Sequence, residues 1–123
     1  MKVLILGANS LIGSAIFRIL SESKGLNVYG TVRSDLFKSF FNEALSSQII
    51  SGFDVFNFDY VISSIKDMKP SLIINCIGIT KHKIQNQDYF KTIEVNSIFP
   101  PKLRLICASM NARLIHISTD CVF

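Results

Sequence analysis

The fold is decided by the opening stretch Met1-Lys2-Val3-Leu4-Ile5-Leu6-Gly7-Ala8-Asn9-Ser10-Leu11-Ile12-Gly13. An apolar strand runs into a glycine turn, and a helix is predicted from about Leu11. Gly7 can adopt the tight turn without a Cβ clash, and Gly13 lets the helix pack close to the sheet. Free backbone N–H groups and the helix dipole then converge on one anion. The pattern predicts a corner that binds the pyrophosphate of a dinucleotide.

Ser10 stands where the usual motif has its middle glycine. Its hydroxyl either caps the helix or contacts a phosphate. An ordinary strand-to-helix turn with no ligand is the alternative, because a motif with only two glycines is not specific.

Apolar, strand-like runs recur along the chain, separated by stretches of helical length: Lys2–Leu6, Asn27–Val32, Gly52–Phe56, Leu72–Ile77 and Arg113–Ser118. Five strands alternating with four helices predict an α/β fold, a Rossmann-like doubly wound parallel sheet with helices on both faces. The sheet is expected to switch direction after the first strand. The carboxyl ends of the strands then line a shared crevice, where the functional site is expected.

Apolar residues at helical spacing predict which helix faces pack in the core. They are Ile12, Ile16, Ile19 and Leu20 in the first helix and Phe37, Phe40, Phe41 and Leu45 in the second. A third helix is predicted from about 59 to 68 and stops before Pro70. A fourth, from about 87 to 110, must break or kink after Asn96-Ser97-Ile98-Phe99 because Pro100 and Pro101 follow.

The 123 residues are enough for one domain, and 49% of them are hydrophobic. The net charge of +4 comes from basic residues that are scattered, apart from Lys81-His82-Lys83. No basic stripe of the kind that nucleic acid requires is present, so we expect no nucleic-acid partner. A mildly positive domain is compatible with a ligand that carries phosphate.

The three cysteines, Cys76, Cys107 and Cys121, lack Cys-x-x-Cys spacing, and each is expected to be a buried, reduced thiol. The opening apolar run is too short for a signal peptide, and no apolar stretch reaches the length that spans a membrane. These features predict a cytoplasmic protein without a membrane partner.

Arg33 follows the second predicted strand, where folds that prefer NAD usually place an acidic residue. A guanidinium offers paired donors that suit a 2′-phosphate, so the sequence favours NADP(H) and leaves NAD(H) open. A solvated surface arginine is the alternative. Asp54 could accept a hydrogen bond from an adenine amino group, although aspartate also caps turns. Gly78 permits close approach of a ribose or nicotinamide.

The carboxyl-terminal Ser118-Thr119-Asp120-Cys121-Val122-Phe123 resembles the extended short-chain dehydrogenases/reductases, and within them the dTDP-4-dehydrorhamnose reductases. The glycine-rich opening, Asp54-Val55, Asn75 and Val95-Asn96 support the resemblance, which spans essentially the whole chain. It implies an oxidoreductase of polysaccharide biosynthesis that reduces a 4-keto nucleotide sugar with NAD(P)H, with the nucleotide sugar as substrate. Whether the protein forms a homodimer is left open by the resemblance.

The resemblance also implies roles for individual residues. Thr119 would be catalytic, hydrogen-bonding the sugar carbonyl and stabilising charge as hydride arrives, and Asp120 would face the substrate. The implied cofactor-binding residues are Gly7, Asn9, Ser10, Leu11, Ile12, Gly13, Asp54, Val55, Cys76, Ile77, Gly78, Thr80, Asn96 and Ser118. His116 is expected to be structural, and no metal is expected.

Three departures separate the chain from that family. Ser10 replaces a glycine, and Cys121 stands where an aromatic residue is common. The family's Tyr-x-x-x-Lys pair has no counterpart, because Tyr29, Tyr60 and Tyr89 are not followed by lysine four residues later. We therefore expect residues 1–123 to be an NAD(P)-binding Rossmann domain, truncated before that pair and the substrate lobe, and inactive alone. The alternatives are a non-catalytic NADP(H)-binding module or sensor and, within the family, a nucleotide-sugar epimerase or dehydratase.

Overall fold

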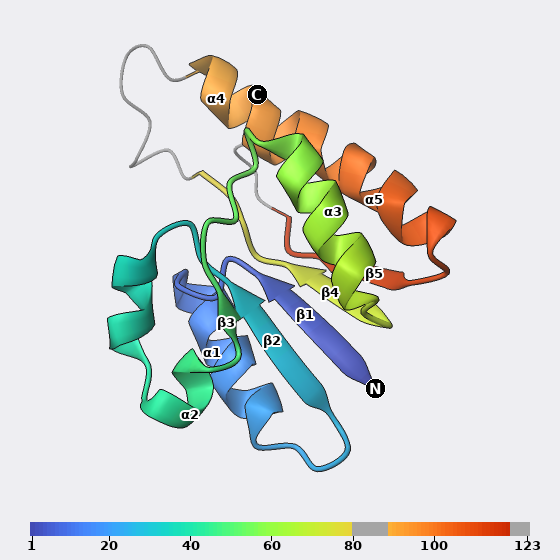
Figure 1. Cartoon of the computed structure of the whole chain (residues 1–123). Helices are drawn as coiled ribbons and strands as arrows, with labels where there is room; N and C mark the ends of the chain where they lie inside the picture. Colours follow the sequence, from blue (N-terminus) through green and yellow to red (C-terminus); the bar gives the residue numbers. More distant parts are fainter. Residues whose placement is uncertain (80–88, 119–123) are drawn as a thin grey trace.

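A computed structural model describes residues 1–79 and 89–118 of the chain (Figure 1). Strands and helices alternate along the chain in this order: β1 (Lys2–Leu6), α1 (Leu11–Ser21), β2 (Asn27–Thr31), the 3₁₀ helix η1 (Asp35–Phe40), α2 (Glu43–Ser46), β3 (Ile49–Ile50), α3 (Phe58–Met68), β4 (Leu72–Asn75), α4 (Tyr89–Ile93), the π-helical segment η3 (Glu94–Ile98), α5 (Phe99–Ser109) and β5 (Arg113–His116). Within the described ranges, none of the helices is long and apolar enough to span a bilayer.

The five strands form one parallel sheet in the order β3-β2-β1-β4-β5. The chain first extends the sheet to one side of β1 and then crosses over to add β4 and β5 on the other side. In the register, Ile5 of β1 lies between Gly30 of β2 and Ile74 of β4. This arrangement confirms the predicted doubly wound α/β fold and places the switch point between β1 and β4, where such folds bind ligands.

Helices cover both faces of the sheet, as the sequence predicts (Figure 1). Alternate residues of β1 point to opposite faces, so Val3 and Ile5 pack with Phe17 of α1. Leu4 and Leu6 belong to the cluster formed with α3 and α5. These four side chains of β1 are almost fully buried, because both faces of a central parallel strand are covered.

The predicted third strand, Gly52–Phe56, is wrong, because β3 comprises only Ile49–Ile50. Gly52 has φ +76°, which ends the extended backbone. The Asp54 carboxylate then accepts a hydrogen bond from the Phe56 N–H at 3.0 Å and closes a turn. Phe53 and Val55 are nevertheless both buried, so a turn produces the alternating pattern of a strand.

The core face of α1 also differs from the prediction. Ile12 and Ile19 are exposed, with 50% and 66% of their surface accessible, whereas Gly13 and Phe17 are buried. Ile16 and Leu20 are partly buried against the same cluster, as predicted. The sequence contains two overlapping apolar stripes, and the close approach of Gly13 to the sheet decides which one faces inward.

The predicted second helix is instead two short ones. The extended backbone of Phe41 ends η1, and the Asn42 side chain caps α2 by accepting from the Leu45 N–H at 2.9 Å. Phe41 is buried, but Phe40 is 67% exposed. The aromatic stripe at helical spacing therefore does not belong to one continuous helix.

The later helices agree better with the sequence. Lys69 ends α3 in a left-handed conformation (φ 53°), directly before Pro70. The predicted break or kink after Phe99 is not a break of the helix: η3, a π-helical segment, joins α4 to α5 with helical backbone at Ile98 and Phe99, and both prolines lie in the first turn of α5. That position suits proline, since the first-turn N–H groups lack intrahelical partners.

The register of α5 after the π-helical segment can be tested with two leucines of the same helix. Leu103 is fully buried, whereas Leu105 is 68% exposed. We expect Leu103→Ala to lower the free energy of unfolding by about 2–5 kcal/mol. The control Leu105→Ala should change it by less than about 0.5 kcal/mol. Denaturant unfolding measures both, and equal losses would contradict the register.

Candidate functional site

The turn between β1 and α1 is held by its own hydrogen bonds. Gly7 has φ +80°, a conformation that favours glycine. The Ser10 hydroxyl donates to the Gly7 carbonyl at 2.9 Å and accepts from the Gly13 N–H at 3.0 Å. The Gly7 N–H in turn donates to the Thr31 hydroxyl at 3.2 Å. Of the two roles left open for Ser10, the structure shows the cap of α1.

Gly13 has no room for a side chain. An added Cβ would overlap the Gly7 carbonyl oxygen and lie 2.7 Å from the Ser10 hydroxyl oxygen. The first turn of α1 is therefore pressed against the end of β1. Because the first N–H groups of any helix lack intrahelical partners, those of Leu11 and Ile12 are available to an anion at this corner.

A cavity of about 230 Å³ opens beside this corner at the carboxyl ends of the strands. Its lining includes most of the cofactor residues that the sequence predicts: Gly7, Asn9, Ser10, Arg33, Asp54, Val55, Cys76, Ile77 and Gly78. Residues from four separated regions of the chain thus meet at one site. The strand order explains this, because β1 lies between β2 and β4 and the ends of all three strands meet here.

Other lining residues were missed by the sequence analysis. Thr31 ends β2 and Val32 follows it, Phe53 and Phe56 lie on either side of Asp54 in the chain, and Val95 comes from η3. Both phenylalanines were placed in the predicted strand Gly52–Phe56 and given no role in binding. Their position beside a polar residue that follows a strand is the signal that could have identified them.

Several predicted residues lie outside this lining. Leu11 and Ile12 expose their side chains and offer only backbone N–H groups to the corner. Ser118 is exposed and does not line the cavity. The predictions for Thr80, Thr119 and Asp120, and that of a reduced Cys121, concern positions outside the described residues.

Asn96 supports the cavity instead of lining it. Its side-chain amide accepts from the Ile79 N–H at 2.9 Å and donates to the Ile79 carbonyl at 2.8 Å. Both hydrogen bonds resemble those of a neighbouring strand, and they attach the segment after β4 to η3. The π-helical segment thereby positions the wall formed by Ile77–Ile79.

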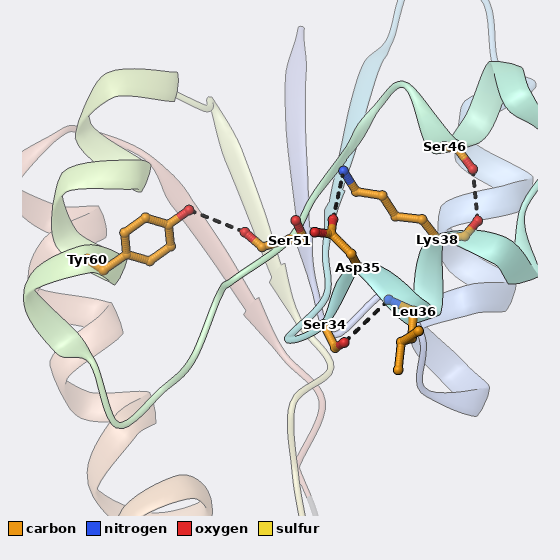
Figure 2. Close-up of polar contacts among 7 residues, drawn as sticks. All are labelled: Ser34, Asp35, Leu36, Lys38, Ser46, Ser51 and Tyr60. Carbon is orange, nitrogen blue, oxygen red and sulfur yellow. Dashed lines mark hydrogen bonds and ion pairs between the residues drawn. The ribbon is translucent and has the colours of Figure 1, made fainter.

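Arg33 and Asp35, two residues apart, have different surroundings. Arg33 is exposed and lines the cavity. The Asp35 carboxylate lies 3.4 Å from the Lys38 ammonium and beside Ser51 (Figure 2). The hydrogen bond from Ser51 and the hydrogen bond and charge of Lys38 lower the pKa of Asp35. Asp35 therefore stays charged but is paired with Lys38, and it does not line the cavity.

The two described cysteines are free thiols, as predicted. Cys76 is half-buried in the cavity wall, and Cys107 is a buried residue of α5. Burial raises the pKa of both thiols, which keeps them protonated and poorly nucleophilic at neutral pH. Among residues 1–79 and 89–118, no three His, Cys, Asp or Glu side chains form a set that could hold a metal ion.

A glycine corner at the switch point of a doubly wound sheet defines the class of dinucleotide-binding α/β domains. Comparison with known families then identifies the particular one. The family described as "RmlD substrate binding domain" matches residues 1–123, and the chain belongs to that family. The predicted resemblance to dTDP-4-dehydrorhamnose reductases and related short-chain dehydrogenases/reductases is thereby confirmed.

Individual relatives are similar over most of this chain. The probable low-salt glycan biosynthesis reductase of Haloferax volcanii is 28% identical over 123 residues, which are 100% of this chain and 38% of that protein. A hypothetical dTDP-4-dehydrorhamnose reductase from Sulfolobus tokodaii has a TM-score of 0.75 at 23% identity, over 98% of this chain and 40% of its own. The dTDP-4-dehydrorhamnose reductase of Bacillus anthracis in complex with NADP has a TM-score of 0.64 at 20% identity, over 92% of this chain and 34% of its own. The chain thus spans well under half of each relative.

The close contact at Gly13 predicts the effect of a side chain there. Gly13→Val should push α1 away from β1 and remove binding of NADP⁺, because the valine would occupy the space of the Gly7 carbonyl. The matched control is Ala15→Val, which introduces the same side chain at an exposed position of α1. Calorimetric titration measures binding, and circular dichroism checks the fold. Unchanged affinity in a folded Gly13→Val variant would show that the phosphate corner lies elsewhere.

Proposed function

We propose that this chain is the cofactor-binding part of an NAD(P)H-dependent nucleotide-sugar reductase that transfers hydride to a 4-keto sugar. The observation that carries the proposal is the cavity in which the Gly7–Gly13 corner, Arg33 and Asp54 meet the wall at Cys76–Gly78. Family membership supports the same class of reaction. The Bacillus anthracis relative, solved with NADP, supports this choice of cofactor.

The residues present fit such a cofactor. At Gly13 a Cβ would overlap the Gly7 carbonyl oxygen, and at Gly7 it would lie 3.1 Å from the Ile77 side chain, so only bare backbone lets the start of α1 come this close to the ends of β1 and β4. The cavity beside this corner would receive the pyrophosphate. The N–H groups of Leu11 and Ile12 would bind it. When bound, the nicotinamide supplies the hydride. The wall at Ile77 and Gly78 would hold the ring over the switch point.

Asp54 would recognise the adenine. One of its carboxylate oxygens already accepts from the Phe56 N–H, which fixes the orientation of the carboxylate. The other oxygen can accept from the adenine amino group. Phe53 and Phe56 lie on either side of Asp54 in the chain and contribute apolar surface to the same cavity.

Arg33 would select the 2′-phosphate of NADPH. Among the described lining residues it is the one cationic side chain, and the neighbouring carboxylate of Asp35 is paired with Lys38 and Ser51 (Figure 2). A guanidinium can bind a phosphate through two parallel hydrogen bonds. Because Asp35 does not line the cavity, no carboxylate at this position would repel the phosphate.

Arg33→Ala tests the choice of cofactor. We expect it to weaken NADPH binding by about 1.5–3 kcal/mol, the range of a hydrogen bond to a charged group. The affinity for NADH, which lacks the 2′-phosphate, should change little and serves as the control ligand. Titration of both cofactors against both proteins measures the difference. Equal affinities of the parent chain for NADPH and NADH would rule out this role of Arg33.

Thr119 would hydrogen-bond the substrate carbonyl and stabilise the charge that develops as hydride arrives. Asp120 would face the sugar. No tyrosine of the 123 residues is followed four positions later by lysine, so proton delivery is assigned to none of them.

Thr119→Val, made in the longest natural form of the protein, tests the catalytic proposal. The valine keeps the shape of the side chain but removes the donor, so turnover should fall by about 10²–10³. The affinity for NADPH should stay the same. Steady-state rates and a thermal melting curve separate catalysis from stability. A normal rate with a lower melting temperature would make Thr119 a structural residue.

A further inference from the structure

Asn75 is a buried polar residue at the point where β4 meets the cavity wall. None of its surface is exposed. Its side-chain oxygen accepts from the Ile77 N–H at 3.1 Å, a local turn that directs the chain from the strand into the wall. Ile77 itself lines the cavity. The side chain of Asn75 therefore fixes one edge of the candidate cofactor site.

The other end of the same amide contacts β5. The Asn75 side-chain nitrogen lies 3.1 Å from Nδ1 of His116, and the two residues are register partners in neighbouring parallel strands. An amide nitrogen can only donate a hydrogen bond. The oxygen of Asn75 is already required by the Ile77 N–H, so the amide cannot be reversed without placing two donors together.

This geometry fixes the tautomer of His116. Nδ1 must accept, so the imidazole is neutral and carries its proton on Nε2. A chain of hydrogen bonds then runs from β5 through β4 to the wall: Asn75 donates to His116 and accepts from Ile77.

We propose that His116 is a positioning residue of the cofactor site, which in its neutral form holds Asn75 and, through Asn75, the Ile77 backbone of the cavity wall. The link to cofactor affinity rests on the function proposed above. The hydrogen-bond chain itself does not, because every member of it belongs to this protein.

Protonation would break the chain. A proton on Nδ1 would face the amide nitrogen of Asn75, so two donors would meet. If Asn75 turned its oxygen to His116, its nitrogen would then face the Ile77 N–H. Either arrangement leaves a buried polar group without a partner, which disfavours the charged ring. Acid should therefore loosen the wall at Ile77.

Burial alone lowers the pKa of His116 from its ordinary value of 6.5. The neutral ring is thus favoured in the folded state, and its contribution to stability is lost as the pH falls from that ordinary value through the lower folded-state pKa. β4 carries no titratable side chain. On α3, η3 and α5, none of the titratable groups contributes to the shift; they are Asp59, Tyr60, Lys66, Asp67, Glu94, Lys102, Arg104 and Cys107.

The hydrogen-bond chain can be tested without any cofactor. The sequence contains two histidines, so His82→Gln leaves His116 as the single imidazole. In ¹⁵N NMR spectra at pH 8, the ring should show the pattern of the Nε2–H tautomer. As the pH is lowered, the amide resonance of Ile77 should shift with the same midpoint as the ring of His116. An Nδ1–H tautomer, or an Ile77 amide whose chemical shift does not change as His116 titrates, would overturn the proposal.

Two variants then test the effect on binding, with NADP⁺ as the probe because it is stable in mild acid. His116→Gln offers Asn75 an acceptor that cannot be protonated at these pH values. His116→Leu offers none. The parent protein should lose affinity between pH 8 and pH 5 by about three- to tenfold relative to His116→Gln. The phosphate of NADP⁺ also titrates in this range, but its effect on affinity is the same for both proteins and cancels in the comparison.

At pH 8, His116→Leu should bind NADP⁺ more weakly than the parent, and His116→Gln should restore the affinity. Parallel pH profiles for the parent and His116→Gln would overturn the role in binding. If no variant binds NADP⁺ but the Ile77 amide still follows His116, the proposed function fails and the hydrogen-bond chain stands.

Discussion

The contact between the first turn of α1 and the end of β1 is the constraint on which the site depends. Gly13 lies so close to the Gly7 carbonyl that no side chain fits between them, and Ser10 connects the two by accepting from one and donating to the other. This contact directs the start of the helix to the switch point of the sheet. An anion placed there meets backbone donors that need no rearrangement, which favours binding of a pyrophosphate.

The rest of the cavity depends on how firmly the neighbouring segments are attached to that corner. Buried asparagines perform this role twice on the β4 side. Asn75 fixes Ile77 from within β4, and Asn96 fixes Ile79 from η3. Amides suit this purpose because one side chain can donate and accept at once without carrying a charge into the core. The wall is thus held by hydrogen bonds from three elements, β4, η3 and β5.

Much of this arrangement could be predicted from the sequence. Glycines, prolines and long apolar runs act locally, so the corner at Gly7, four of the five strands and an irregular helix next to Pro100 were all recognisable. The errors arose where burial does not reveal backbone geometry. Phe53 and Val55 alternate like a strand although they form a turn, and Ile12 belongs to an apolar stripe that faces solvent. The pairing of Asn75 with His116 depends on strand order, which no local pattern contains.

The central claim is that the Gly7–Gly13 corner holds the pyrophosphate of a nicotinamide dinucleotide, and titration with NADP⁺ followed by backbone amide NMR tests it most directly. If the cofactor binds at this corner, the amides of Gly7, Ser10, Gly13 and Gly78 should show saturable shifts. The amides of Lys66 and Met110, which line a separate hollow away from this corner, should not move. Saturable shifts confined to that second region, or no binding at millimolar cofactor, would show that the corner does not hold the pyrophosphate.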